Sequence, residues 1–271
     1  STRTRNSMEA GIAQLGGTGI FLDTSKMQIS HGESANDTAQ ILSSYGHGIA
    51  CRNCFWERGN KYLREMAANS TVPIMNLQCD LYHPMQALAD LMTIQEVFPE
   101  GKSLNVSSIW AYATTHKKPI IVPLSQILLF PRYNLNVPLA YPEGYDLPDW
   151  AVAKAQENAL AGGGSFRITH DMEDAYRGAD IVIPKNWGSW VKNQSTEVVD
   201  DLLQSYKHWK CTEKLIALAN PDVKYMHALP ADRGNEVEDA VIDGPHSIIY
   251  QEAENRLHTA KAVMTLTMGD K

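Results

Sequence analysis

This 271-residue sequence has few cysteines, no long apolar run and no cluster of basic residues. No apolar segment approaches the roughly 20 residues that a membrane-spanning helix needs, and no secretory signal is visible. The net charge of -7 argues against a nucleic-acid partner, because no basic run would neutralise successive phosphates. These absences predict a cytoplasmic protein, and they leave room for a local pocket that binds one small anion.

The cysteines do not form a metal-binding pattern. Cys51 and Cys54 make a C-x-x-C pair, but Cys79 and Cys211 stand alone and supply no second pair. Zinc or redox chemistry at CRNC is the weaker interpretation, and four reduced thiols are the stronger one. H-E-x-x-H and the P-loop are absent, and GGG at 162–164 lacks the spacing of a dinucleotide site. We therefore predict neither a metal nor a cofactor.

Apolar segments of strand length alternate with helical segments throughout the chain, as a layered α/β fold requires. The predicted strands are 72–78, 104–110, 135–141, 165–169, 179–184, 223–229 and 247–250. The predicted helices include 148–161, 171–178 and about 251–268. Because the strands are short and mostly apolar, they favour parallel sheets covered by helices on both faces.

Turn residues at FPEGKS (98–103) mark the predicted domain boundary. We predict one domain of residues 1–98 plus 251–271 and a second of residues 99–250, each with a mostly parallel sheet flanked by helices. In such sheets ligands bind beyond the carboxyl ends of the strands, so the residues just after each strand are candidates for function.

A small set of side chains meets this criterion. STRTR sets hydroxyls and guanidiniums at the start of a predicted helix and suits a phosphate, although helix capping and solvation explain the same residues. The other candidates are Arg52, His83, Gln86, His227 and Arg256. Each has a structural alternative: a histidine before proline is commonly a capped structural residue, and Arg256 could pair with Glu252 one turn away.

Five motifs in a fixed order resemble the aspartate and ornithine carbamoyltransferase family. They are S-T-R-T-R, G-I-x-x-R, H-P-x-Q-A-L-A-D, H-x-L-P-A and E-N-R-x-H, and they extend from Ser1 to about Met264. The resemblance implies that Ser1, Thr2, Arg3 and Thr4 hold the phosphate of carbamoyl phosphate. It also implies that Arg52 bridges the phosphate and the carbonyl group.

The same resemblance assigns the residues around the carbamoyl group. His83 and Thr4 would polarise the carbonyl oxygen. Gln86 and the backbone carbonyl of Leu229 would hold the carbamoyl NH2, with Arg256 nearby.

The family pattern also implies an assembly and a position for this sequence within a longer protein. The loop DTSKMQISHGES would reach into a neighbouring subunit's site, with Gln28 making the contact, in a homotrimer with shared active sites. Related proteins carry a helix and a strand before the first motif, so we expect this sequence to be incomplete at its amino end.

The region for the second substrate departs from the ordinary ornithine pattern. IPKNWGSW contains Lys185 and Trp187 but lacks the aspartate that heads the usual D-x-W-x-S-M-G loop, so ordinary ornithine loses the partner of its α-ammonium group. Lys118 and Lys185 could bind a carboxylate while Trp187 lines the pocket, or both lysines could be solvated. His227 and Ala228 would lie on the amine side, with Ala228 replacing the usual cysteine of H-C-L-P.

WAYATTHKKPIIVPLSQ (110–126) is similar to the proline-rich loop of the knotted transcarbamylases, a branch that includes the N-acetylornithine and N-succinylornithine enzymes. The resemblance implies a trefoil knot in the second domain. WAY, NLQCD, YPEGYD and P-K-x-W are most similar to bacterial knotted carbamoyltransferases whose second substrate is poorly assigned and which are associated with purine or ureido-compound catabolism.

The sequence thus predicts an enzyme that transfers a carbamoyl group between carbamoyl phosphate and the amine of an amino-acid-like substrate. The reaction could also run in the catabolic direction, from a ureido acid. One alternative is a non-catalytic relative or assembly subunit that binds carbamoyl phosphate, which Ala228 and the missing amino end keep open. A nucleotide-binding oxidoreductase is disfavoured because the glycine fingerprint is absent.

Overall fold

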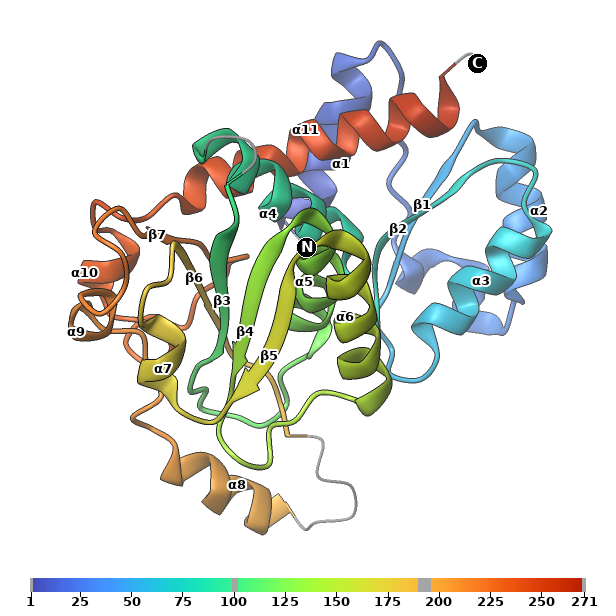
Figure 1. Cartoon of the computed structure of the whole chain (residues 1–271). Coiled ribbons are helices and arrows are strands. Elements are labelled where there is room, and N and C mark those ends of the chain that lie inside the picture. The colour runs from blue at the N-terminus through green and yellow to red at the C-terminus, as the bar shows by residue number, and fades with distance from the viewer. Residues whose placement is uncertain (1, 99–101, 190–195, 270–271) are drawn as a thin grey trace. The chain divides into compact units, whose positions relative to one another are not determined.

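The computed structural model describes residues 2–98, 102–189 and 196–269 (Figure 1). The chain forms two compact units, Ser1–Met92 with Ala253–Lys271 and Thr93–Glu252. Each unit contains parallel strands flanked by helices, so the predicted α/β fold class is confirmed. Helices α4 (Pro84–Val97) and α11 (Ile249–Met268) cross the boundary between the units.

The first unit contains a two-stranded parallel sheet, in the order β1-β2. Besides α4 and α11, its elements are α1 (Thr2–Gln14), η1 (Thr24–Lys26), η2 (Gln28–His31), α2 (Ala35–Tyr45), β1 (Ile49–Asn53), α3 (Gly59–Asn69) and β2 (Ile74–Cys79). The register shifts between Cys51 and Arg52, so that Arg52 pairs with Gln78. The sequence analysis did not predict β1 as a strand.

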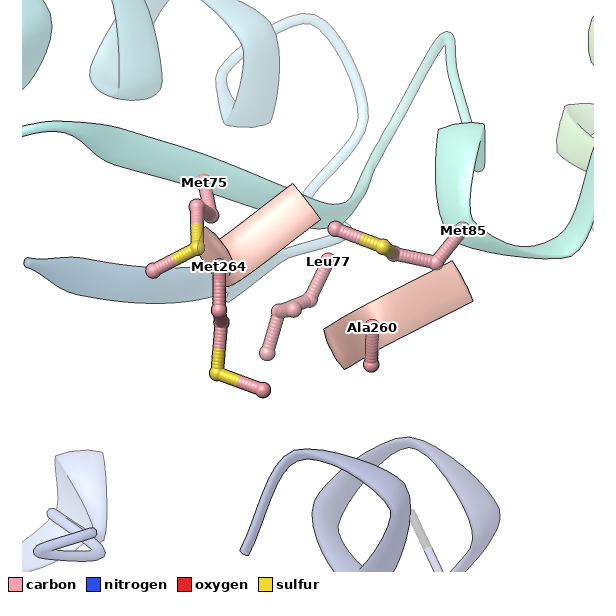
Figure 2. Close-up of a cluster of buried hydrophobic side chains, with 5 residues drawn as sticks. All are labelled: Met75, Leu77, Met85, Ala260 and Met264. Carbon is pink, nitrogen blue, oxygen red and sulfur yellow. The ribbon is translucent and has the colours of Figure 1, made fainter. Parts of the chain in front are cut away.

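A methionine-rich core joins four elements of this unit, and Figure 2 shows its buried side chains. Met75 and Leu77 come from β2, Met85 from α4, and Ala260 and Met264 from α11. Met8 and Ile12 of α1 pack against the same cluster. The unbranched methionine side chain fills irregular gaps well, so this core fixes α1, β2, α4 and α11 against one another.

The second unit is a five-stranded parallel sheet in the order β5-β4-β3-β6-β7 (Figure 1). Its strands are β3 (Leu104–Trp110), β4 (Leu135–Ala140), β5 (Ser165–Thr169), β6 (Ile181–Lys185) and β7 (Lys224–Tyr225). Its helices are α5 (Ile121–Leu129), η3 (Phe130–Tyr133), α6 (Asp149–Gly162), α7 (Met172–Tyr176), α8 (Thr196–Ser205), α9 (Glu213–Ile216) and α10 (Asp239–Ile242). From β3 the strand order runs to β4 and β5 on one side, and then returns to the other side of β3 with β6 and β7. The junction of β3 and β6 is therefore the switch point, where open α/β sheets bind ligands.

Local sequence signals account for the helix ends in this unit. Helix α7 begins after Asp171, whose carboxylate accepts hydrogen bonds from the Glu173 and Asp174 amides. Helix α6 is capped at its carboxyl end by Gly163, which has a φ of 77°. A Cβ atom at Gly162 would lie 2.3 Å from the Cα of Arg132, so a glycine is needed there for close packing.

Two predicted strands need correction. The prediction for 247–250 is wrong, because Ile249 begins the long helix α11 and only Ser247 makes an isolated bridge, to Tyr225. A four-residue apolar run cannot by its period distinguish a strand from a buried helix start. The strand predicted at 223–229 is Lys224–Tyr225 alone, since the His227 amide leaves the sheet to donate to the Glu252 carboxylate at 2.7 Å. The trefoil knot stays a prediction.

Candidate active site

The amino-terminal helix α1 brings one residue of STRTR into a buried polar cluster. The Thr4 side chain is 3% exposed, while Thr2 is exposed and Arg3 is half-buried. Arg5 is turned to other partners, since its Nε donates to Glu9 Oε1 at 2.9 Å and its guanidinium lies over the Phe21 ring. Ser1 lies outside the described residues.

The Thr4 hydroxyl accepts hydrogen bonds from two guanidinium groups. Arg256 Nη2 lies 3.1 Å from Thr4 Oγ1, and Arg52 Nη1 lies 3.3 Å from it. A hydroxyl has two acceptor lone pairs and a single proton. Because both lone pairs are used by cations, the Thr4 proton is left to donate, and a nearby anion is the partner that this charge environment favours.

The start of helix α4 supplies the next side chains. His83 is 5% exposed and Gln86 is 2% exposed. Arg256 Nη1 donates to Gln86 Oε1 at 2.6 Å, while Gln86 Nε2 donates to Asp90 Oδ1 at 2.7 Å. These two bonds fix which end of the Gln86 amide is oxygen and which is nitrogen.

His83 is a neutral imidazole at neutral pH. Burial holds its pKa well below the usual 6.5, and the positive charges of Arg256, Arg52 and Arg3 lower it further. A neutral imidazole carries one N–H, which can donate a hydrogen bond to a carbonyl oxygen, and the ring has no positive charge. The first unit therefore gathers Arg3, Arg52 and Arg256 around one imidazole and one hydroxyl, which is the composition of an anion and oxyanion site.

The second unit places Lys185 at the end of β6, paired in register with Trp110 of β3 at the switch point. Its Nζ donates to Glu236 Oε1 and to Asn186 Oδ1, both at 3.0 Å. Burial lowers the pKa of Lys185, the Glu236 carboxylate opposes that effect, and the charge of Lys118 lowers the pKa further. The two lysines named from the sequence are therefore electrostatic neighbours.

Trp187 is part of the packed interior, with 1% of its surface exposed. Its indole Nε1 donates to the Tyr145 carbonyl at 2.8 Å, and its own carbonyl accepts from Trp110 Nε1 at 2.9 Å. These bonds fix the backbone that follows Lys185. In addition, the Gly188 amide donates to the carbonyl of Lys118 at 2.9 Å, which ties the Lys118 loop to the same strand end.

The loop after β7 holds His227, Ala228 and Leu229. The His227 side chain is fully buried and Ala228 is 8% exposed. Leu229 has a φ of 49°, an unusual conformation for a leucine, and its amide donates to His227 Nδ1 at 2.9 Å. The imidazole thus supports the turn that sets the direction of the Leu229 carbonyl.

Gln28 lies in the short helix η2 and is exposed. Its Oε1 is 3.1 Å from His31 Nδ1, three residues further along the chain. The prediction that Gln28 contacts a neighbouring subunit stays a prediction.

The cysteines are all free thiols. Burial raises the pKa of Cys51 to about 11 and also raises the pKa of Cys54, so neither is a ready nucleophile. Within residues 2–98, 102–189 and 196–269, no three His, Cys, Asp or Glu side chains are grouped so as to hold a metal ion. No helix in those ranges is both long enough and apolar enough to cross a membrane.

Two buried carboxylates that contact site residues were given no role in the sequence analysis, although Asp90 ends the motif H-P-x-Q-A-L-A-D. Asp90 is fully buried beside Gln86, and its i+4 spacing on a helix is a signal that could have revealed the contact. Glu236 is fully buried beside His227, nine residues earlier, and Lys185, 51 residues earlier. No local pattern predicts that second cluster.

Comparison with known proteins agrees with the motifs. The family profile "Aspartate/ornithine carbamoyltransferase, carbamoyl-P binding domain" matches residues 1–96, and "Aspartate/ornithine carbamoyltransferase, Asp/Orn binding domain" matches residues 121–267. The ornithine carbamoyltransferase of Thermococcus kodakarensis is 38% identical over 270 residues, covering 99% of this chain and 81% of the relative. The putative carbamoyltransferase YgeW of Escherichia coli O157:H7 is 36% identical and covers 93% of this chain and 74% of the relative.

Solved structures match in the same way. An N-acetyl-L-ornithine transcarbamylase variant in complex with PALAO has a TM-score of 0.90 and 30% identity, covering 98% of this chain and 86% of the other. The ornithine carbamoyltransferase of Pyrococcus furiosus has a TM-score of 0.86 and 35% identity, covering 100% and 82%. The chain therefore belongs to the aspartate/ornithine carbamoyltransferase family. It is an enzyme, and its activity is that of a carbamoyltransferase.

Proposed function

We propose that this enzyme transfers a carbamoyl group from carbamoyl phosphate to the amine of an ornithine-like or N-acylated amino acid, or runs the reverse reaction on a ureido acid. The single observation that carries the proposal is the Thr4 hydroxyl, which lies between two guanidinium groups and has its proton left to donate. In this proposal the first unit binds carbamoyl phosphate and the second binds the amine substrate.

The chemistry needs only groups that the chain supplies. A neutral amine attacks the carbonyl carbon, a C–N bond forms, and the carbonyl oxygen becomes an oxyanion held by His83 and Thr4. The oxyanion then re-forms the C=O bond, the C–O bond to phosphate breaks, and the phosphate leaves with its electron pair toward Arg3 and Arg52. The departing phosphate takes the proton that the attacking nitrogen loses. Donors preorganised at both developing charges stabilise this pathway.

The carbamoyl NH2 is assigned to two acceptors. They are Gln86 Oε1, whose orientation is fixed by the bond from Arg256, and the Leu229 carbonyl, which follows the turn at His227. For the second substrate, Lys118 and Lys185 favour a carboxylate. The absence of an aspartate at the head of PKNW favours an acylated α-amine over a free α-ammonium group.

A matched pair of arginine variants tests the phosphate site. Arg3→Ala should raise the KM for carbamoyl phosphate by about ten-fold or more, because it removes a guanidinium that the proposal assigns to the phosphate and whose charge already acts on the neighbouring His83. Arg5→Ala removes the same charge two residues away, but its partners are Glu9 and Phe21, so its KM should stay within about two-fold of wild type. Equal effects of the two variants would refute the assignment.

The activity itself is tested by a transfer screen. Carbamoyl phosphate is offered with ornithine, N-acylornithines, aspartate, putrescine and diaminopropionate, and the ureido products are offered with phosphate or arsenate. Phosphate release that depends on the added amine, and that is lost in Arg52→Ala and His83→Ala, supports the proposal. If the protein binds carbamoyl phosphate but transfers no carbamoyl group in either direction, the non-catalytic alternative is supported instead. The matches to enzymes over nearly the whole chain do not favour that alternative.

A further inference from the structure

The loop that follows His227 returns a buried carboxylate, Glu236, to the same histidine. Glu236 has no exposed surface, yet no motif of the sequence included it and the proposed reaction does not use it. Its Oε2 accepts from the Asp232 amide at 2.8 Å, which closes the loop, and its Oε1 accepts from the Asn186 amide at 2.6 Å. The remaining contacts are with side chains of the second unit's candidate site.

Two ionisable side chains lie against the same carboxylate oxygen. Lys185 Nζ is 3.0 Å from Glu236 Oε1, and His227 Nε2 is 3.3 Å from it. Burial opposes ionisation of Glu236, but the contacts with His227 and Lys185 and the Asp232 amide lower its pKa to about 2. Glu236 is therefore a fixed negative charge within the second unit.

The position of that charge selects the tautomer of His227. The Leu229 amide donates to His227 Nδ1 at 2.9 Å, so Nδ1 is an acceptor and carries no proton. In the neutral imidazole the proton then lies on Nε2, the nitrogen that faces Glu236. The carboxylate stabilises this tautomer, and this tautomer stabilises the turn at Leu229.

We infer that Glu236 is a positioning residue that acts through His227 to hold the Leu229 carbonyl in the direction required to accept from the carbamoyl NH2. The inference rests on the proposed function, since it takes the carbamoyl role of Leu229 from there. The Glu252 carboxylate also helps to hold His227, because it accepts a hydrogen bond from the His227 backbone amide at 2.7 Å. Both the backbone and the ring of His227 are thus held by buried carboxylates.

The test is Glu236→Gln, which keeps the shape of the side chain and removes the charge. Its matched control is Glu238→Gln, the same change two residues away, where the carboxylate accepts from the Glu213 amide and does not enter the His227 cluster. Glu236→Gln should lower kcat by roughly 10- to 100-fold, as expected for a misplaced reacting group, with the dissociation constant for carbamoyl phosphate within about two-fold of wild type. Glu238→Gln should leave both values near wild type.

A direct measurement of the histidine separates positioning from a merely structural effect. Nitrogen-15 NMR of the His227 ring, assigned with His227→Asn, should show protonated Nε2 and unprotonated Nδ1 in the wild-type enzyme, and a mixture of tautomers in Glu236→Gln. A wild-type ring protonated on Nδ1 would overturn the inference without any need for a folded variant. So would an unchanged kcat in a folded Glu236→Gln.

The two proposals fail in different ways. If the wild-type enzyme transfers no carbamoyl group to any acceptor, the proposed function fails, whereas the tautomer measurement still reports whether Glu236 controls His227. If the wild-type enzyme is active and Glu236→Gln is equally active with the same tautomer, only the positioning role fails.

Discussion

Replacing Thr4 with valine removes one hydroxyl from the buried polar cluster of the first unit and preserves the shape of the side chain. The hydroxyl is 3.1 Å from Arg256 Nη2 and 3.3 Å from Arg52 Nη1, and in the proposed reaction it donates its proton to the oxyanion. The substitution therefore acts on stability through the arginines and on catalysis through the lost donor. These effects can be measured separately.

The stability effect comes mainly from Arg256. Its side chain is 3% exposed, so the acceptor that it loses is not replaced readily by water, at a cost of about 1.5–3 kcal/mol for a bond to a charged donor. Arg52 is exposed, and water replaces its longer contact with little cost. Urea denaturation of Thr4→Val should thus show a loss of about 1–3 kcal/mol.

The catalytic effect should be larger. Removal of one donor to a developing oxyanion lowers kcat by about 10²–10³-fold in comparable sites. Steady-state kinetics with carbamoyl phosphate and the best acceptor from the screen measure kcat, and calorimetry measures binding. Thr4→Ser retains the hydroxyl and is the control, with kcat expected within about three-fold of wild type. A folded Thr4→Val with wild-type kcat would refute the role given to this hydroxyl.

Three further predictions concern pH, packing and metals. The folded-state pKa of His83 is below the unfolded value of 6.5, so its stabilising effect is complete above pH 6.5 and is lost as the pH falls toward the folded pKa; urea midpoints at pH 7 and pH 5 should differ less in His83→Gln than in wild type. Gly162→Ala should destabilise the protein by about 1–3 kcal/mol, because the added Cβ meets the Arg132 backbone, and a thermal melt equal to wild type would contradict this packing. Dialysis against EDTA should leave activity unchanged, and a loss restored by a divalent cation would show a metal that the proposed mechanism does not use.

Much of the fold could be predicted from the sequence because its signals are local. The strands at 104–110 and 165–169 are found with the predicted bounds. Helix α6 (Asp149–Gly162) follows Pro148 and ends at the predicted glycines. The errors come where the same local pattern has two outcomes. At 247–250 an apolar run begins a helix, since Ile249 is buried as the first residue of α11, and the single bridge at Ser247 is too short to make a strand.

The candidate site, like the fold, could be predicted from the sequence only in part. Thr4, Arg52, Gln86 and Arg256, which lie up to 252 positions apart, are joined by hydrogen bonds, although the sequence offered an isolated structural explanation for each. Their association could be anticipated only from the family resemblance, because no pattern of spacing measures contact between distant segments.

The buried carboxylates are the part of the candidate site that could not be anticipated from the sequence. Side chains that face a phosphate or an oxyanion are donors, so a search for function in sequence selects arginine, histidine and hydroxyl residues. Each such donor also needs a partner that holds it without competing for the substrate, and an ionised carboxylate, which only accepts, meets that need. Asp90 holds Gln86 in the first unit and Glu236 holds His227 in the second, and both carboxylates are fully buried. Because a buried carboxylate is costly unless it is bonded in this way, its presence in an otherwise apolar segment is a reason to look for the donor it serves.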